Sequence, residues 1–329
     1  MAKQAAKSVS RKRSAITRVA SPSIQFEIPY EIERRTPSDL FSLDQSIGGG
    51  FPDNTITEIY GWEYVGKSTV ADYLSGKLAV PHSRIGFLAF EPFGQAYVES
   101  NLRMAGFSGK VWVVPTLSPK GDPLTHEERI DLLIDSARDD PTLTVGVVDT
   151  LSAIVSTQES EGSVADANMG KRAQLIHRLM RKTLALQMTQ RVKMGAPFAL
   201  LACNHLGQIM GMQASTTTGG TAPKKYAATR LRLAINKRYE DGSLWVQGAV
   251  EKVRFRGEAG NREAFHVFLK AGLGVHPGLT AVIDCIQMGY AENEQGRISM
   301  GAKKFGLFSK MIEKEDYDFT PFVNRLQQD

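Results

Sequence analysis

Short apolar runs alternate with amphipathic segments through the first two thirds of the chain. The apolar runs lack strict alternation with polar residues, and runs of this kind are typical of parallel strands buried on both faces. The segments between them have the spacing of helices. The expected strands are Thr55–Tyr60, Arg84–Phe90, Val111–Val114, Leu143–Val148 and Pro197–Cys203. The expected helices are Ser68–Leu78, Glu127–Arg138 and Met169–Met194.

The pattern changes after about residue 230, where the apolar runs become shorter and alternate more with polar residues. Such alternation favours antiparallel strands. The stretch 275–329 is expected to form a small α-rich module. The sequence therefore predicts an α/β fold with a mostly parallel central sheet, an antiparallel extension and this C-terminal module. The expected antiparallel strands are Leu231–Ile235, Leu244–Val253 and Ala264–Phe268.

Composition is that of an ordinary soluble globular protein. Of the 329 residues, 42% are hydrophobic and 23% are charged, which is usual for this class. No apolar run is long enough for a membrane span, and the basic N-terminus lacks the apolar stretch of a secretory signal. The two cysteines, Cys203 and Cys285, lie far apart, so a reduced, cytoplasmic compartment is expected and a structural zinc site is not.

The net charge of +5 is concentrated at the N-terminus. Residues 1–18 hold six of the 40 basic residues and no acidic one, which leaves 34 basic against 35 acidic residues elsewhere. Residues 1–21 are predicted to be a disordered basic tail, either solubilising or steering DNA. A nucleic-acid site in the rest of the chain must therefore be a local patch. Pro22 and Pro29 argue against a helix in residues 22–37 and favour a short strand or docking arm.

The strongest chemical signal follows the strand at Thr55–Tyr60. The stretch GWEYVGKS, Gly61–Ser68, fits G-x-x-x-x-G-K-[ST] without a mismatch, between a predicted strand and a predicted helix. Glycines let main-chain N–H groups turn towards phosphate oxygens, and the helix N-terminus adds its positive end. Lys67 is expected to neutralise the phosphates of ATP and Ser68 to bind Mg²⁺. The alternative is a glycine-rich turn without a ligand.

Two carboxylates are expected beside this loop. Asp149 directly follows the apolar strand Leu143–Val148. In P-loop proteins a carboxylate at the end of such a strand contacts the coordination shell of Mg²⁺. Glu91 follows the strand Arg84–Phe90, at the sheet edge where parallel sheets bind ligands, and is placed to orient or deprotonate the attacking water. The alternatives are a turn or N-cap role for Asp149 and a solvated loop position for Glu91.

Two polar residues and a long loop follow the strand Pro197–Cys203. Asn204 and His205 should lie at the same edge, where His205 could sense the γ-phosphate, although a lone histidine is more often structural. Residues 206–221, LGQIMGMQASTTTGGT, are uncharged and unusually long for a loop in a compact core. They are either a disordered surface loop or a DNA-contacting loop that binds phosphates and inserts an apolar side chain such as Met210 between bases.

These stretches together resemble the RecA/UvsX family of ATP-dependent DNA recombinases, most closely a bacteriophage or bacterial member. The resemblance covers about residues 38–305 and includes FSLDQSIGGGFP, EIYGWEYVGKST, FLAFE and VGVVDTLSAI. ESEGSVADANMGKRAQLIHRLMRKTL resembles the family's first DNA-binding loop and the helix after it, and STTTGGTAPKKYAATRLRL resembles the end of the second loop. The TTTGG run followed by K-x-Y-A-x-x-R-L is the most specific match, because other P-loop ATPases have no reason to carry it.

The resemblance implies a RecA-like P-loop ATPase core over residues 38–274. Within it, DNA loops are expected near 159–170 and 206–221. The segment 22–37 would be a polymerisation arm, and the module 275–329 would bind DNA.

The resemblance also implies residue roles. Glu91 is the catalytic base, supported by Lys67 and His205. Lys252 and Arg254 reach the γ-phosphate held by a neighbouring subunit, the alternative being a solvated strand face. The implied contacts with ATP and Mg²⁺ are Gly61, Val65, Gly66, Lys67, Ser68, Thr69, Tyr97 and Asp149. The implied contacts with DNA are Met169, Gly170, Arg181, Met210, Thr216, Thr217, Gly219 and Gly220.

Some positions depart from the family pattern. His205 stands where bacterial members mostly carry glutamine, so the sensor could respond to pH. Tyr97 is one position out of register with the tyrosine that stacks on adenine. The second loop is shorter than in bacterial members, and the usual N-terminal polymerisation helix is not evident.

The leading hypothesis is a strand-exchange protein that forms a filament on single-stranded DNA, pairs it with double-stranded DNA and hydrolyses ATP between subunits. It would act in the cytoplasm of a bacterium or of a phage-infected host. A ring helicase with the same core and a non-catalytic recombination mediator are the alternatives. The STTTGG loop argues against the helicase, and the intact Lys67, Glu91 and Asp149 argue against the mediator.

Overall fold

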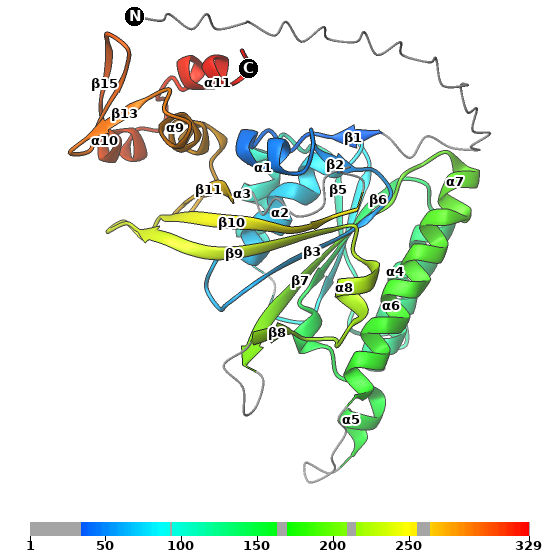
Figure 1. Ribbon diagram of the computed structural model, residues 1–329. Coiled ribbons are helices and arrows are strands. Elements are labelled where there is room, and N and C mark those ends of the chain that lie inside the picture. The colour runs from blue at the N-terminus through cyan, green and yellow to red at the C-terminus, as the bar shows by residue number, and fades with distance from the viewer. Residues whose placement is uncertain (1–33, 93, 163–169, 209–214, 255–263, 329) are drawn as a thin grey trace, which may run out of the picture. The chain divides into compact units, whose positions relative to one another are not determined.

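A large mixed sheet forms the centre of the computed structural model, which describes residues 34–92, 94–162, 170–208, 215–254 and 264–328 (Figure 1). Its strand order is β12-β11-β10-β9-β3-β7-β6-β4-β5, and β8 pairs with β7. The strands from β9 to β5 run parallel, and β10, β11 and β12 continue the sheet antiparallel. The predicted α/β fold with its antiparallel extension is therefore confirmed. The parallel strands are β3 (Ile56–Gly61), β4 (Arg84–Ala89), β5 (Lys110–Val113), β6 (Leu143–Asp149), β7 (Ala199–Gln208) and β9 (Thr229–Arg238). The others are β8 (Ser215–Thr217), β10 (Leu244–Val253), β11 (Ala264–Lys270) and β12 (Gly274–Val275).

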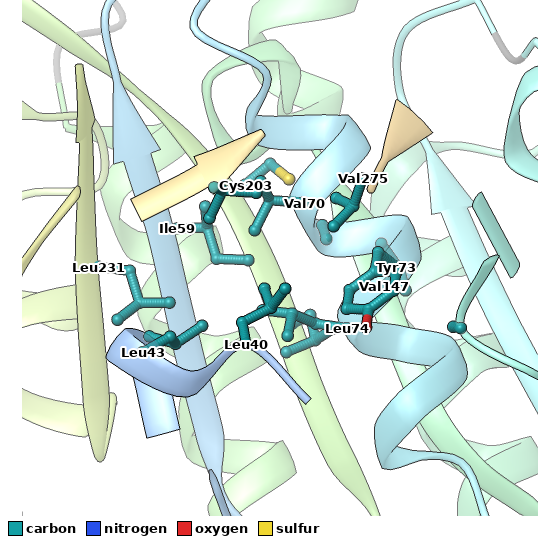
Figure 2. Close-up of a cluster of buried hydrophobic side chains, with 14 of the residues drawn as sticks. Leu40, Leu43, Ile59, Val70, Tyr73, Leu74, Val147, Cys203, Leu231 and Val275 are labelled. Carbon is teal, nitrogen blue, oxygen red and sulfur yellow. The ribbon is translucent and has the colours of Figure 1, made fainter. Parts of the chain in front are cut away.

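Helices cover both faces of this sheet. Along β7, Leu201 and Cys203 belong to one buried cluster, whereas Leu200 and Ala202 belong to the other. Figure 2 shows part of the first cluster, in which Leu43 and Val70 pack with strand residues such as Ile59. Burial on both faces explains why the strands are apolar without alternation. The first face is covered by α1 (Phe41–Ser46), α2 (Lys67–Leu78) and α3 (Gln95–Met104). The second is covered by α4 (His126–Asp139), α6 (Lys171–Met188) and α8 (Ala222–Tyr226).

The prediction of a single helix over Met169–Met194 is wrong. The helix α6 ends at Met188, and a short helix, α7 (Gln190–Met194), follows after Thr189, whose backbone leaves the helical region at φ −125° and ψ −83°. The break lets Arg191 turn inwards, where its side chain is fully buried. Its guanidinium donates hydrogen bonds to the main-chain carbonyls of Ala137, Asp140, Pro141, Ala196 and Pro197.

The C-terminal module contains a small sheet as well as the expected helices. In the described residues its helices are α9 (Pro277–Gln287), α10 (Phe308–Glu313) and α11 (Thr320–Leu326). A three-stranded antiparallel sheet, which the sequence analysis did not predict, consists of β13 (Glu292–Glu294), β14 (Arg297–Met300) and β15 (Lys303–Leu307). Gln295 and Gly296 link its first hairpin, both with positive φ, as a two-residue hairpin turn requires.

A two-residue strand is the described part of the segment expected to be an arm. β1 (Arg35–Thr36) pairs with β2 (Phe51–Pro52) in antiparallel register. Residues 1–33, with the predicted basic tail and most of the arm, lie outside the described residues. None of the helices described here is both long and apolar enough to cross a membrane.

A buried carboxyl group joins α1 to α9. Asp284 Oδ2 accepts the main-chain N–H of Ser42 at 3.1 Å, whereas Asp284 Oδ1 is buried with no hydrogen-bond partner among the described residues. Burial raises the pKa of Asp284 from its usual 3.8 to about 7. The folded protein therefore holds this proton more tightly than the unfolded chain, so stability falls as the pH rises from about 4 to 7.

We therefore expect Asp284→Asn to be more stable than the wild type above pH 7. The difference should reach roughly 4 kcal/mol at about 1.36 kcal/mol per pKa unit, and it should shrink towards pH 4. Urea unfolding of both proteins at pH 4.5 and pH 8 measures it. An equal stability difference at the two pH values would contradict the assignment to Asp284.

Candidate nucleotide site and its connection to the second loop

The P-loop connects β3 to α2 and leaves the start of α2 open to a ligand. Tyr64 and Gly66 have positive φ, 59° and 86°, and no side chain caps the first turn of α2, so its N–H groups are available to an anion. A Cβ on Gly61 would lie 2.5 Å from Leu233 O, and a Cβ on Gly66 would collide with the Leu269 side chain. Gly61 is therefore required by packing, and Gly66 by its positive φ as well. Val65 is buried beneath the loop.

The lysine of this loop lies buried between carboxylates. Lys67 Nζ donates a hydrogen bond to Trp62 O at 2.8 Å. Burial lowers the pKa of Lys67, while the nearby charges of Asp149 and Glu91 act in the opposite direction. The ammonium group is thus already held at the phosphate-binding loop, among groups that favour its charged form.

Tyr97, an expected nucleotide contact, lies beside the same loop. Thr69 Oγ1 and Tyr97 Oη are 3.1 Å apart, which brings the first turn of α3 against the first turn of α2. Tyr97 is 40% exposed. Its contact with the nucleotide stays a prediction.

The other site residues lie at the carboxyl ends of neighbouring parallel strands. Asp149 ends β6 opposite Ala89, the last residue of β4, and Glu91 follows two residues later. His205 lies on β7 opposite Gly61, and its Nε2 is 3.8 Å from Glu91 Oε1. The structure therefore brings Glu91, Asp149 and His205 to the P-loop, as the sheet-edge argument predicts.

The surroundings of His205 favour the neutral form of its side chain. Burial lowers the pKa of His205, the charge of Lys67 lowers it further, and Glu91 opposes both. A neutral imidazole can donate one hydrogen bond and accept another. The side chain is therefore suited to sense an oxygen of the γ-phosphate without adding charge.

A buried polar cluster behind His205 was not identified from the sequence. Asn204 Nδ2 donates to Glu58 Oε1 at 2.8 Å and to Thr218 O at 2.9 Å, and Asn204 Oδ1 accepts the N–H of His205 at 2.9 Å. Glu58 is fully buried, and its Oε2 accepts from Arg230 Nε at 2.5 Å. One amide side chain therefore connects the sensor position to the second loop. The sequence held one signal of this cluster, which is the charged residue Glu58 within the predicted buried strand TITEIY.

The second loop follows β7, the strand that carries His205, and its end pairs back with that strand. β7 continues to Gln208, and β8 returns antiparallel with Leu206 opposite Thr217. Thr217 is buried, while the Thr216 hydroxyl accepts a hydrogen bond from Lys224 Nζ. Gly219 and Gly220 both have positive φ. Residues 209–214, including Met210, lie outside the described residues.

The first loop is described only at its two ends. The short helix α5 (Thr157–Glu161) precedes residues 163–169, which include Met169 and are not described. Gly170, at φ 100°, caps the start of α6. Arg181 is exposed on α6 and lines a shallow groove with Arg178 and Lys182. This basic groove fits the predicted local patch for DNA, and its role stays a prediction.

The two candidate interface cations lie against α8. Lys252 Nζ donates to Lys224 O at 2.8 Å, and Arg254 donates to Lys225 O at 2.8 Å. Burial lowers the pKa of Lys252, with Arg254 adding to the effect. Their contact with a neighbour's nucleotide stays a prediction.

The fold and the nucleotide-binding edge define a P-loop NTPase core. A family model described as the RecA N-terminal domain matches residues 27–256. The chain therefore belongs to the RecA family. Protein RecA of Picosynechococcus sp. is 31% identical over 230 residues, or 65% of this chain and 59% of that protein. For Protein RecA of Chloroherpeton thalassium the identity is 31% over 204 residues, 61% of this chain and 53% of that protein. The chain thus spans between about half and three fifths of the length of these relatives.

Proposed function

We propose that this protein is an ATP-dependent recombinase that polymerises on single-stranded DNA and exchanges strands with a homologous duplex. The observation that carries this proposal is the position of Asn204. Its side chain holds the second loop at Thr218 and the main chain of His205 at the nucleotide edge. A nucleotide-dependent movement of His205 would therefore reach the loop that resembles a DNA-binding segment. In this proposal the protein acts in the cytoplasm of a bacterium or of a phage-infected host.

The residues of the site suit ATP with Mg²⁺. The uncapped N-terminus of α2 and the buried Lys67 offer donors to the phosphates, and Ser68 with Asp149 offers oxygen ligands for the metal. Bound Mg²⁺ would neutralise charge on the β- and γ-phosphates. In this proposal Glu91 accepts a proton from the attacking water and His205 hydrogen-bonds the γ-phosphate, which is supported by the 3.8 Å between His205 Nε2 and Glu91 Oε1. The hydrolysis step thus uses groups from four elements of one sheet edge.

Filament assembly would complete the site between subunits. Lys252 near the end of β10 and Arg254 just after it would contribute cations, and the segment 22–37 would dock on the next subunit. The C-terminal module 275–329 would contact duplex DNA. Binding through phosphates and loop backbone predicts little sequence preference.

Electron microscopy with single-stranded DNA and a slowly hydrolysed ATP analogue tests the proposal. Helical filaments that form only with nucleotide, together with strand exchange in a gel assay, are the expected result. Closed rings with duplex unwinding would favour a helicase. DNA binding without ATP turnover by the wild type would favour a non-catalytic mediator.

His205→Ala should uncouple ATP binding from DNA binding, because the γ-phosphate contact is lost while Asn204 still holds the loop. Without nucleotide, the affinity for single-stranded DNA should match the wild type. The increase on adding an ATP analogue should disappear. Fluorescence anisotropy with a labelled oligonucleotide measures both affinities. An unchanged nucleotide-dependent increase would refute the sensor role.

A further inference from the structure

The first turn of α4 touches both the strand that carries Glu91 and the segment that leads to the first loop. Thr125 caps this helix through a reciprocal capping box with Glu128, which fixes its first turn. His126 and Arg129, three residues apart, lie on one side of that turn. Figure 1 shows α4 alongside α6, the helix that begins where the first loop ends.

Arg129 holds the end of β4. The residue is buried, and its guanidinium donates to Ala89 O at 2.7 Å. It also lies over the Phe90 ring, with 5.1 Å between Cζ and the ring centroid. Ala89 and Phe90 are the two residues before Glu91. The N–H of Phe90 in turn donates to Asp149 O at 2.8 Å, so the same peptide joins the ends of β4 and β6.

His126 holds the segment beyond Asp149. Its Nδ1 accepts the N–H of Val155 at 2.9 Å, and its ring packs on Phe90 with centroids 4.5 Å apart. The adjacent Glu127 accepts the N–H of Thr157, the first residue of α5. The base of the first loop is therefore fastened to the helix turn that supports Glu91.

We propose that His126 and Arg129 are positioning residues that couple the first loop to Glu91, so that DNA at this loop adjusts the carboxylate and stimulates ATP turnover. This inference rests on the proposed function. The chain of contacts runs from Thr157 and Val155 through α4 to Phe90, and Phe90 precedes Glu91 directly. Neither positioning side chain belongs to the P-loop or to the expected DNA contacts.

The coupling has two ends, Phe90 before Glu91 and Val155 before the first loop. It is tested by changing a side chain at one end and measuring hydrogen exchange at the other. Arg129→Met removes hydrogen bonds to Ala89 O and Val114 O, at the ends of β4 and β5, and His126→Ala removes the side-chain acceptor of the Val155 N–H. With neither ATP nor DNA present, Arg129→Met should speed hydrogen exchange of the Val155 amide by about 5-fold or more. His126→Ala is not a cross-test, because its ring also packs on Phe90. An exchange rate that Arg129→Met changes only at Phe90 overturns the proposal.

Two matched variants control for the loss of similar contacts elsewhere. Arg84→Met removes an arginine at the opposite end of β4, which pairs with Asp140. His276→Ala removes an Nδ1 that accepts the Leu279 N–H and a ring that packs on Phe319. Neither control should alter exchange at Val155 or Phe90. Equal effects from the controls would mean that the faster exchange comes from a general loss of stability and not from a connection between the first loop and Glu91.

Steady-state kinetics then test whether this coupling affects ATP turnover. His126→Ala and Arg129→Met should lower the ratio of DNA-stimulated to basal kcat by about 5-fold or more, with the KM for ATP unchanged. Arg129→Lys should recover part of it, because an ammonium can still donate to Ala89 O. An unaltered ratio in both variants overturns the inference. A wild type without DNA stimulation would instead defeat the proposed function, while the exchange data still decide whether the two ends are linked.

Discussion

Glu91→Gln is expected to lower ATP turnover by roughly 10²–10⁴-fold, the contribution typical of a general base. Glutamine keeps the shape of the side chain at the end of β4 but cannot accept a proton from water. ATP should therefore still bind, because Lys67 and the N-terminus of α2 are unchanged. Phosphate release measures turnover, and a fluorescent ATP analogue measures binding.

Glu63→Gln is the matched control for that prediction. Glu63 is another carboxylate whose charge acts on both Lys67 and His205, but it lies within the P-loop, whereas Glu91 follows β4. Removing its charge should leave turnover within a few-fold of the wild type. Equal losses in the two variants would mean that negative charge near Lys67 matters, rather than proton transfer by Glu91.

Glu58→Ala is expected to destabilise the protein by about 3–5 kcal/mol, because it leaves the Arg230 charge buried without its main partner. The ion pair joins neighbouring strands β3 and β9, with a distance of 2.5 Å between Glu58 Oε2 and Arg230 Nε. Asn204 also loses one of its two acceptors. Urea unfolding at neutral pH gives the change in free energy.

An exposed pair provides the comparison. Asp131 and Lys182 form a salt bridge between α4 and α6 with both side chains nearly half exposed, so Asp131→Ala should cost only about 0–1 kcal/mol. The double variant Glu58→Leu with Arg230→Met should recover much of the stability lost by Glu58→Ala, since no buried charge remains. Similar losses in Glu58→Ala and Asp131→Ala would show that burial does not determine the energy of these pairs.

The nucleotide edge could be predicted from the sequence because its chemistry follows local patterns. Gly61–Ser68 is contiguous, and Glu91, Asp149 and His205 each follow an apolar strand. Parallel strands end at one edge, so their last residues must meet. A DNA-contacting loop at residues 206–221 with Met210 was one interpretation of the local pattern, and the other DNA contacts came from the resemblance.

The features missed depend on contacts that no local pattern reveals. Glu58 and Asn204 are 146 positions apart in the chain, and each alone fits an ordinary strand. Arg129 lies in an amphipathic segment, where an arginine usually faces solvent. The break at Thr189 depends on five carbonyls around Arg191, four of them at strand ends or loops. By contrast, the β13–β14 hairpin had a local signal, since Gln295-Gly296 occupies the two-residue turn.

The buried arginine after the helix break fixes one end of α6. Arg191 fastens the chain just beyond the C-terminal end of α6 to the sheet edge opposite the nucleotide. The other end, at Gly170, adjoins the first loop. An α-helix of 18 residues is roughly 27 Å long and resists bending. If α6 tilted about its anchored end near Arg191, the end at the first loop would move most. A rotation of about 5° would move Lys171 by about 2 Å.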